Sequence, residues 1–151
     1  MRKAPDHRRD YVEFMELQTR WSDNDVFGHI NNMVYYSLFD TAISSWLVNN
    51  GILNLHKDRQ VSVIAQNGCT YFSEVAFPDK LTAGLRICHI GHSSVRYELG
   101  LFRNEEENAS AEGHFVHVYL NALTRKPEVI GEPLRVVLSR LLRPEAVGME
   151  E

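Results

Sequence analysis

The stretch that decides the fold runs from residue 31 to residue 51 and reads NNMVYYSLFDTAISSWLVNNG. It predicts a helix that begins at Asn31 or Asn32, because either side chain can cap the first turn. The run Asn49-Asn50-Gly51 is a C-terminal signal, so the helix should end near Val48. Apolar residues cover most of the helix circumference and leave only a narrow stripe of small polar groups. Such a helix is expected to be surrounded by protein rather than to lie on a surface.

The segments on either side of this helix alternate between apolar and polar residues, which predicts strands. One strand is expected at residues 11–20, where a change in the phase of the apolar residues indicates a β-bulge. The remaining elements are expected after the helix, as strands at 61–72, 81–88, 95–101 and 114–120 and a short closing helix at 133–142. This order predicts an α+β domain, in which an antiparallel curved sheet of about five strands wraps around one long central helix.

The bulk properties predict one ordinary globular domain. The chain has 151 residues and shows no linker, repeat or low-complexity tract. We expect the domain to span residues 11–143, with flexible tails at 1–10 and 144–151. The formal net charge of -4 disfavours nucleic acid as a partner. No segment is apolar enough for a secretory signal or a membrane helix, and two cysteines do not make a disulfide framework. These features predict a soluble cytoplasmic protein that binds neither nucleic acid nor membranes.

The most informative segment comes directly before the long helix. Residues 20–32 read RWSDNDVFGHINN, and Tyr35 follows. This segment resembles the R-[WF]-x-D-x-D-x-x-G-H-x-N-N-x-x-Y signature of hotdog-fold acyl-CoA thioesterases of the 4-hydroxybenzoyl-CoA thioesterase type. Weaker likenesses follow at 77–81, 91–94 and 111–113, and the chain departs at Ser73-Glu74, where relatives commonly carry a basic residue and a proline. The resemblance implies the hotdog fold and hydrolysis of acyl-CoA, with coenzyme A as part of the substrate and no cofactor.

The resemblance also assigns roles to individual residues. The second acidic residue of the D-x-D pair is catalytic in the family, and here it is Asp25, acting as a general base on water or as a nucleophile. The free backbone amides at the helix start, near Asn31 and Asn32, would stabilise the negative charge on the thioester oxygen. The catalytic residues are therefore expected to be Asp25, His29 and Asn32. Contacts with substrate or coenzyme A are expected from Gly28, Asn31, Tyr35, Gly91, His92, Ser93 and Ser94.

Other interpretations of these residues stay open. Asp25 could be a turn residue that accepts backbone hydrogen bonds, a role that suits Asp23 better. Asp25, His29 and Asn31 are also the residue types that hotdog hydratases and dehydratases use, although their order and spacing differ here. A non-catalytic module that binds acyl thioesters is the third alternative.

Metal and thiol chemistry are disfavoured, and an assembly is expected. His114 and His117 are three residues apart and so face opposite sides of a strand, which predicts no metal site there. Cys69 lies in a predicted strand without a neighbouring base, which disfavours it as the nucleophile. A single hotdog leaves an exposed sheet edge, and family members pair so that the site is completed across the interface. We therefore expect a homo-oligomer, either a dimer or a tetramer.

Overall fold

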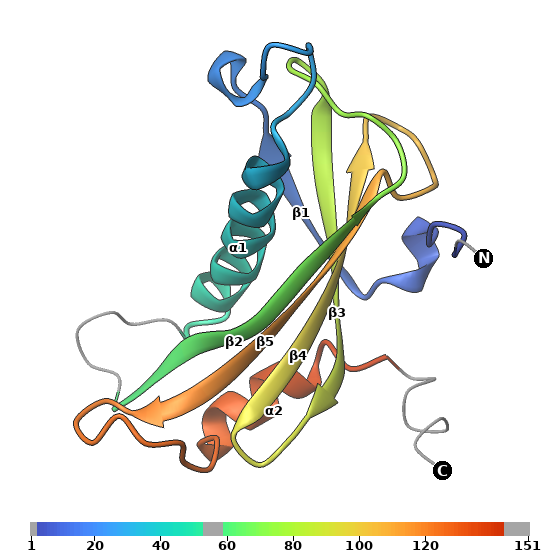
Figure 1. The fold of residues 1–151 in the computed structure, drawn as a ribbon. Coiled ribbons are helices and arrows are strands. Elements are labelled where there is room, and N and C mark those ends of the chain that lie inside the picture. The colour runs from blue at the N-terminus through green and yellow to red at the C-terminus, as the bar shows by residue number, and fades with distance from the viewer. Residues whose placement is uncertain (1–2, 53–58, 144–151) are drawn as a thin grey trace.

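The computed structural model describes residues 3–52 and 59–143, and it shows one curved sheet with a long helix against it (Figure 1). The main elements are β1 (Glu13–Gln18), α1 (Asn32–Asn49), β2 (Gln60–Tyr71), β3 (Lys80–Ile90), β4 (Ser94–Arg103), β5 (Ala111–Asn121) and α2 (Glu132–Ser139). Short 3-10 helices at Arg8–Asp10 and Trp21–Asp23 precede β1 and α1. Within the two described ranges, no helix is long and apolar enough to cross a membrane.

The strands form one antiparallel sheet in the order β1-β3-β4-β5-β2. Alternate residues of β3, β4 and β5 point toward α1 and belong to one buried core, including Leu85, Leu99 and Phe115. Leu85 lies opposite Leu99 in the β3–β4 register, so the core runs across neighbouring strands. Burial of this apolar face is the main stabilising contribution to the domain. The predicted α+β hotdog architecture is confirmed.

Helix α1 begins and ends where the sequence predicts. The side-chain oxygen of Asn31 accepts a hydrogen bond from the amide of Met33 at 2.9 Å, which makes Asn31 the N-cap. Gly51 follows the helix with a φ of 74°, a left-handed conformation that favours glycine. The expectation that protein surrounds the helix is wrong for the single chain, because the sheet covers only one side. On the other side, Met33 is 75% exposed and Val48 is 54% exposed.

Strand β1 pairs with β3 without a register shift, from Glu13 opposite Leu85 to Gln18 opposite Lys80. The β-bulge expected in this strand is therefore wrong. The phase change in the sequence has another cause, since Phe14 is largely exposed on the outer face, whereas Met15 and Leu17 pack against the core. The register shifts lie instead in β2 and β3, between residues 64 and 66 and between residues 87 and 89.

Residues 3–10 pack against the outer face of the sheet, which differs from the flexible tail expected through residue 10. Asp6 forms an ion pair with the Arg86 guanidinium at 3.1 Å, and Glu98 pairs with the same guanidinium at 2.9 Å. The Arg86 side chain is only 9% exposed, so this cation is screened little by solvent. Arg86 and Glu98 lie on strands far along the chain from Asp6, which is why local sequence patterns do not indicate this contact.

Tyr11 holds the same N-terminal segment to the sheet by filling a recess between two glycines. Gly84 and Gly100 lie opposite each other in the β3–β4 register. A Cβ atom on Gly84 would lie 2.8 Å from the Tyr11 ring, and one on Gly100 would lie 2.7 Å from it. The ring also meets Phe102 edge-on, with centroids 5.8 Å apart. Both glycines are therefore required for the close approach of Tyr11.

Helix α2 closes the structure and is shorter than the helix expected at 133–142. Pro133 stands in its first turn, as predicted. Beyond the helix, the amide of Ile87 donates to the carbonyl of Leu141 at 2.8 Å, so the chain end is joined to β3. Leu138 and Leu141 are fully buried. The tail expected at 144–151 lies outside the described residues.

Substitution of Gly100 tests the fit of Tyr11. Gly100→Ala should lower the free energy of unfolding by about 1–3 kcal/mol, the usual cost of forcing extra volume into a packed site. Urea denaturation of the variant and the wild type measures this difference. In a Tyr11→Ala background the same substitution should cost much less, because the ring that it would meet is gone. An equal cost in both backgrounds would contradict the proposed contact.

Candidate active site

A buried aspartate holds the loop between β1 and α1. Asp23 is 2% exposed, and its carboxylate accepts hydrogen bonds from the Arg20 backbone amide at 2.8 Å and the Arg20 guanidinium at 2.9 Å. The backbone carbonyl of Asp23 accepts the amide of Asn31 at 3.0 Å. Asp23 therefore ties the beginning of the loop to the first residues of the helix, which is the structural role expected for it.

Asp25 lies in a tight turn within this loop. Its Oδ1 accepts the Phe27 amide at 2.9 Å, and its backbone carbonyl accepts the Gly28 amide at 3.1 Å. Gly28 has a φ of 85°, which a side chain would strain. The other carboxylate oxygen, Oδ2, lies 3.8 Å from Nδ1 of His29, beyond hydrogen-bond length. The turn interpretation of Asp25 thus accounts for one oxygen and leaves the second oxygen available for chemistry.

The backbone amides of the first turn of α1 differ in their partners. The amide of Asn31 donates to Asp23, the amide of Met33 to the Asn31 side chain, and the amide of Val34 to the Asn31 carbonyl. Among the described residues, the amide of Asn32 has no such partner. The amides near Asn31 and Asn32 were the predicted donors to the substrate, and in this structure the Asn31 amide instead donates to the loop. Asn32 therefore carries the free N–H group at the positive end of the helix dipole.

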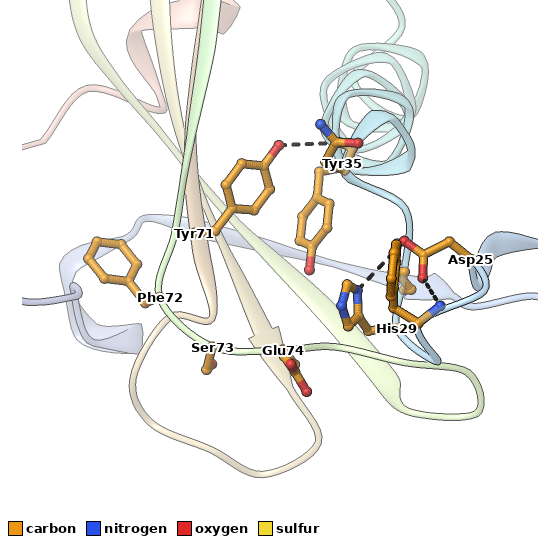
Figure 2. Close-up of a pocket in the computed structure, with 10 residues that line it drawn as sticks. Asp25, His29, Tyr35, Tyr71, Phe72, Ser73 and Glu74 are labelled. Atoms are coloured by element: carbon orange, nitrogen blue, oxygen red, sulfur yellow. Dashed lines mark hydrogen bonds and ion pairs between the residues drawn. The ribbon is translucent and has the colours of Figure 1, made fainter.

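These groups border a cleft of about 490 Å³. Figure 2 shows Asp25 and His29 on one side of it, the segment from Tyr71 to Glu74 on the other, and Tyr35 between them. The cleft is lined by Asp25, Phe27, His29, Ile30, Asn32, Tyr35, Tyr71, Phe72, Ser73 and Glu74. The structure thus brings together four residues predicted for the site, Asp25, His29, Asn32 and Tyr35. Gly28 and Asn31 shape the loop and the helix cap beside it.

Two tyrosines form the inner wall of the cleft. The rings of Tyr35 and Tyr71 meet edge-on with centroids 4.9 Å apart, and the Tyr71 hydroxyl donates to the carbonyl of Asn32 at 3.3 Å. Burial raises the pKa of Tyr35 to about 12, and the nearby Cys69 thiol and Glu74 carboxylate add to the shift. Tyr35 is therefore a neutral hydroxyl at physiological pH. It can both donate and accept hydrogen bonds in the cleft.

The sequence did not identify the β2 side of the cleft. Tyr71 and Phe72 end the predicted strand at 61–72, and Ser73-Glu74 follows them. The one signal there was the departure from the family pattern at Ser73-Glu74. Strand patterns alone cannot show that the end of β2 lies beside the start of α1, because that contact depends on how the sheet curves around the helix.

The turn from Gly91 to Ser94 lies at the other end of the sheet (Figure 1). β3 runs from the end of the sheet near the cleft to this turn, a length of roughly 30 Å at about 3.3 Å per residue. Arg135 donates to the carbonyl of Gly91 at 2.9 Å, and the amide of Ile130 donates to the carbonyl of His92 at 3.0 Å. Within one chain, the structure therefore does not place the predicted contact residues Gly91, His92, Ser93 and Ser94 near Asp25.

Cys69 and the histidines offer little alternative chemistry. Burial raises the pKa of the Cys69 thiol to about 11, so it is protonated at neutral pH. Cys69 does not line the cleft. In the part of the chain that the structure describes, no group of three or more His, Cys, Asp or Glu side chains could hold a metal ion.

Comparison with known proteins gives the family. The sequence model of the thioesterase-like superfamily matches residues 19–138, which is most of the chain. The chain is 38% identical to the PA5185 protein from Pseudomonas aeruginosa strain PAO1, whose crystal structure it matches with a TM-score of 0.89 over 93% of this chain and 98% of that one. A thioesterase from Thermus thermophilus, complexed with coenzyme A and Zn, is 25% identical, with a TM-score of 0.74 over 89% of this chain and 98% of that one.

A third relative gives a shorter match. The uncharacterised protein YsmA of Bacillus subtilis (strain 168) is 26% identical over 82 residues, which is 54% of this chain and 55% of that protein. The family match and the PA5185 structure each cover far more of the chain and agree with the architecture of one sheet around one long helix. The chain therefore belongs to the thioesterase-like superfamily, the hotdog-fold hydrolases of thioesters.

Proposed function

We propose that this protein hydrolyses acyl-coenzyme A thioesters to a free acid and coenzyme A, in the cleft between Asp25 and Tyr71. One observation carries the proposal: Asp25 and Asn32 line the same cleft, Asp25 has a carboxylate oxygen outside the turn, and the Asn32 backbone amide has no partner among the described residues. The coenzyme A bound to the related Thermus thermophilus thioesterase supports this choice of carrier. The carbonyl carbon of the thioester would lie between the two groups.

The amide of Asn32 would stabilise the charge that develops during the reaction. As the carbonyl carbon becomes tetrahedral, its oxygen becomes negative, and a fixed N–H donor at a helix N-terminus stabilises that oxygen. Because the neighbouring amides of Asn31 and Met33 have protein partners, the geometry of the Asn32 amide is set before substrate binds. Collapse of the intermediate then breaks the carbon–sulfur bond, and coenzyme A leaves as a thiolate that takes up a proton.

Asp25 would supply the attacking group by one of two routes. As a general base, it takes a proton from water while the water oxygen attacks the carbonyl. As a nucleophile, its Oδ2 attacks directly and forms a mixed anhydride that water then opens. His29 would assist Asp25 by forming a hydrogen bond with its carboxylate. In the structure the His29 Nδ1 lies 3.8 Å from Asp25 Oδ2. A substrate-induced shift of about 1 Å would bring the pair into hydrogen-bond range.

We infer that the active form is a homo-oligomer. β2 is an edge strand of the sheet, and Val63 and Ile64 on it are 43% and 46% exposed. Met33 and Val48 are also exposed, on the side of α1 that the sheet does not cover, and no described element covers them. Exposed apolar edges of this kind are normally covered by another copy. A two-fold dimer through β2 would bring the far end of the partner's sheet toward the cleft, and the turn from Gly91 to Ser94 with it.

The structure gives the hydratase alternative little support. That chemistry would draw on Asp25, His29 and Asn31, yet the Asn31 side chain is occupied in capping Met33. An absorbance assay with crotonyl-CoA distinguishes hydration of the double bond from release of thiol. A non-catalytic module that binds acyl thioesters would bind the same substrates without releasing thiol.

Replacement of the proposed catalytic carboxylate tests the mechanism. Asp25→Asn should lower kcat at least about a hundredfold, because it removes the base or nucleophile. It keeps a side-chain oxygen for the Phe27 amide, so the turn should persist. Thiol detection with a panel of short, long and aromatic acyl-CoA esters provides the measurement.

Glu16→Gln serves as the control, since it removes an exposed carboxylate from β1. Equal turnover by wild type and Asp25→Asn would exclude Asp25 from the reaction. A single turnover in heavy-oxygen water, with enzyme in excess, tests for the anhydride. Label recovered in the Asp25 carboxylate requires an anhydride that water opens at the Asp25 carbon, whereas label in the released acid alone is the product of the general-base route and of an anhydride that water opens at the acyl carbon.

Cys69 provides a second test, with a defined pH dependence. Its pKa of about 11 means that roughly one thiol in a thousand is ionised at pH 8, so alkylation by iodoacetamide should be slow. The rate should rise about tenfold per pH unit up to that pKa. The measurement uses a Cys88→Ser protein, in which Cys69 is the one remaining cysteine. Cys69→Ser should retain hydrolysis, and its loss with the fold intact would favour a thiol mechanism.

The assembly is tested by mass. Native mass spectrometry at micromolar concentration should give a dimer or a tetramer. Ile64→Glu places a charge on the exposed β2 edge and should shift the protein toward monomer. Leu123→Glu, at a residue 93% exposed in the turn after β5, is the matched control. A wild-type protein that is only monomeric would refute the proposal that a second copy completes the cleft.

A further inference from the structure

We propose that the cleft selects acyl groups that carry a positive charge, such as an ammonium or trimethylammonium group, an inference that rests on the proposed hydrolysis of acyl-CoA. The chemistry of the residues that line the cleft carries this proposal. Aromatic rings and hydrogen-bond acceptors dominate the lining, and among the described residues it contains two carboxylates but no lysine or arginine.

The rings give the cleft walls that attract cations. Tyr71 is half-buried at the end of β2, and the buried ring of Tyr35 supports it edge-on at 4.9 Å. On the opposite side, Phe27 stacks on His29 with centroids 6.3 Å apart. The face of an aromatic ring carries partial negative charge, and a quaternary ammonium group loses little solvation when it contacts one. A neutral acyl chain of the same shape gains only the apolar part of this contact.

Glu74 adds a formal charge to the same space. It follows β2 closely and lines the cleft opposite Asp25 (Figure 2). The Glu74 side chain forms no ion pair with any described residue. After burial and the Cys69 thiol, Glu74 also contributes to the raised pKa of the Tyr35 hydroxyl. Figure 2 shows that hydroxyl directed toward the space between His29 and Glu74.

Three cations near the cleft already have acidic partners, and one of them is Lys3, which lies 5.9 Å from the Phe72 ring and pairs with Asp6 and Glu112. The Arg103 guanidinium donates to the backbone carbonyl of Glu74 at 3.2 Å, and it lies 3.6 Å from Asp79 and 3.5 Å from Glu106. The Arg20 guanidinium pairs with Asp23. None of these cations forms an ion pair with the Glu74 carboxylate, whereas Asp25 adds a second negative group. The long pantetheine arm of coenzyme A keeps its phosphates away from this end of the substrate.

Two esters of equal shape test the proposal on the full chain. The first is ω-trimethylammoniobutyryl-CoA, and the second is its neutral isostere, in which a quaternary carbon replaces the nitrogen. At low ionic strength the wild type should favour the cationic ester by roughly five- to thirtyfold in kcat/KM, the range that one ring contact and one partly exposed carboxylate can supply. Added salt should reduce the ratio, because it screens the carboxylate.

Variants then locate the preference. Glu74→Gln should bring the ratio of the two esters close to one, mainly by raising KM for the cationic ester. Glu105→Gln removes an exposed carboxylate from the turn between β4 and β5 and should leave the ratio unchanged. Equal kcat/KM for both esters in the wild type, or an unchanged ratio in Glu74→Gln, would overturn the proposal while leaving hydrolysis in place.

A binding measurement separates this inference from the proposed reaction. Thioether analogues of the two esters, in which a methylene group replaces the carbonyl, cannot be hydrolysed. Calorimetry should show tighter binding of the cationic analogue to the wild type and not to Glu74→Gln. If neither ester releases thiol, the proposed hydrolysis fails, and the analogues still decide whether the cleft prefers a cation. Equal binding of both analogues would refute that preference.

Discussion

The hydrogen bond from the amide of Asn31 to the carbonyl of Asp23 is the constraint on which the candidate site depends. It removes one amide of the helix start from use and fixes the direction of the next, which is the amide of Asn32. The Asp23 carboxylate is itself held by Arg20, so the anchor is buried and satisfied. A helix N-terminus always offers several unpaired amides, but here the loop and the cap consume all but one in the first turn, as far as the described residues show. The site thereby gains a single donor in a defined place.

The same loop explains how Asp25 can be structural and reactive together. One of its oxygens closes the turn on Phe27, which holds the side chain in one orientation. The second oxygen remains directed toward His29 and the cleft. A carboxylate held by only one oxygen has lost its rotational freedom while its other oxygen stays available, and this is the preorganisation that catalysis requires. The turn interpretation and the catalytic interpretation of Asp25 are therefore compatible.

Much of this arrangement could be predicted from the sequence, and the failures have identifiable physical causes. The bounds of α1 followed from its asparagine cap and its Asn-Asn-Gly end, which are local signals. The bulge in β1 was wrong because Phe14 tolerates exposure, and burial cannot be read from apolar character alone. The contacts of Asp6 and Tyr11 join segments far apart in the chain, and the Gly84–Gly100 recess appears only once β3 and β4 are paired. The Asn31 amide donates to the backbone carbonyl of Asp23, and a hydrogen bond between two backbone groups cannot be predicted from the identity of the side chains.

The two sides of the cleft come from different parts of the chain, and they differ in how much they can vary. The side with Asp25, His29 and Asn32 is a short segment whose turn, cap and anchor depend on one another, so a change at one residue disturbs the rest. The other side begins with Tyr71 at the end of the edge strand β2 and continues into Ser73 and Glu74, which are exposed. Loop positions at the end of a rigid scaffold can change at little cost to the fold. Ser73-Glu74, where the sequence departs from the pattern that it otherwise resembles, falls on that side. Under the proposed function, a change there would alter which acyl group is accepted and would leave the carboxylate and amide of the opposite wall in place.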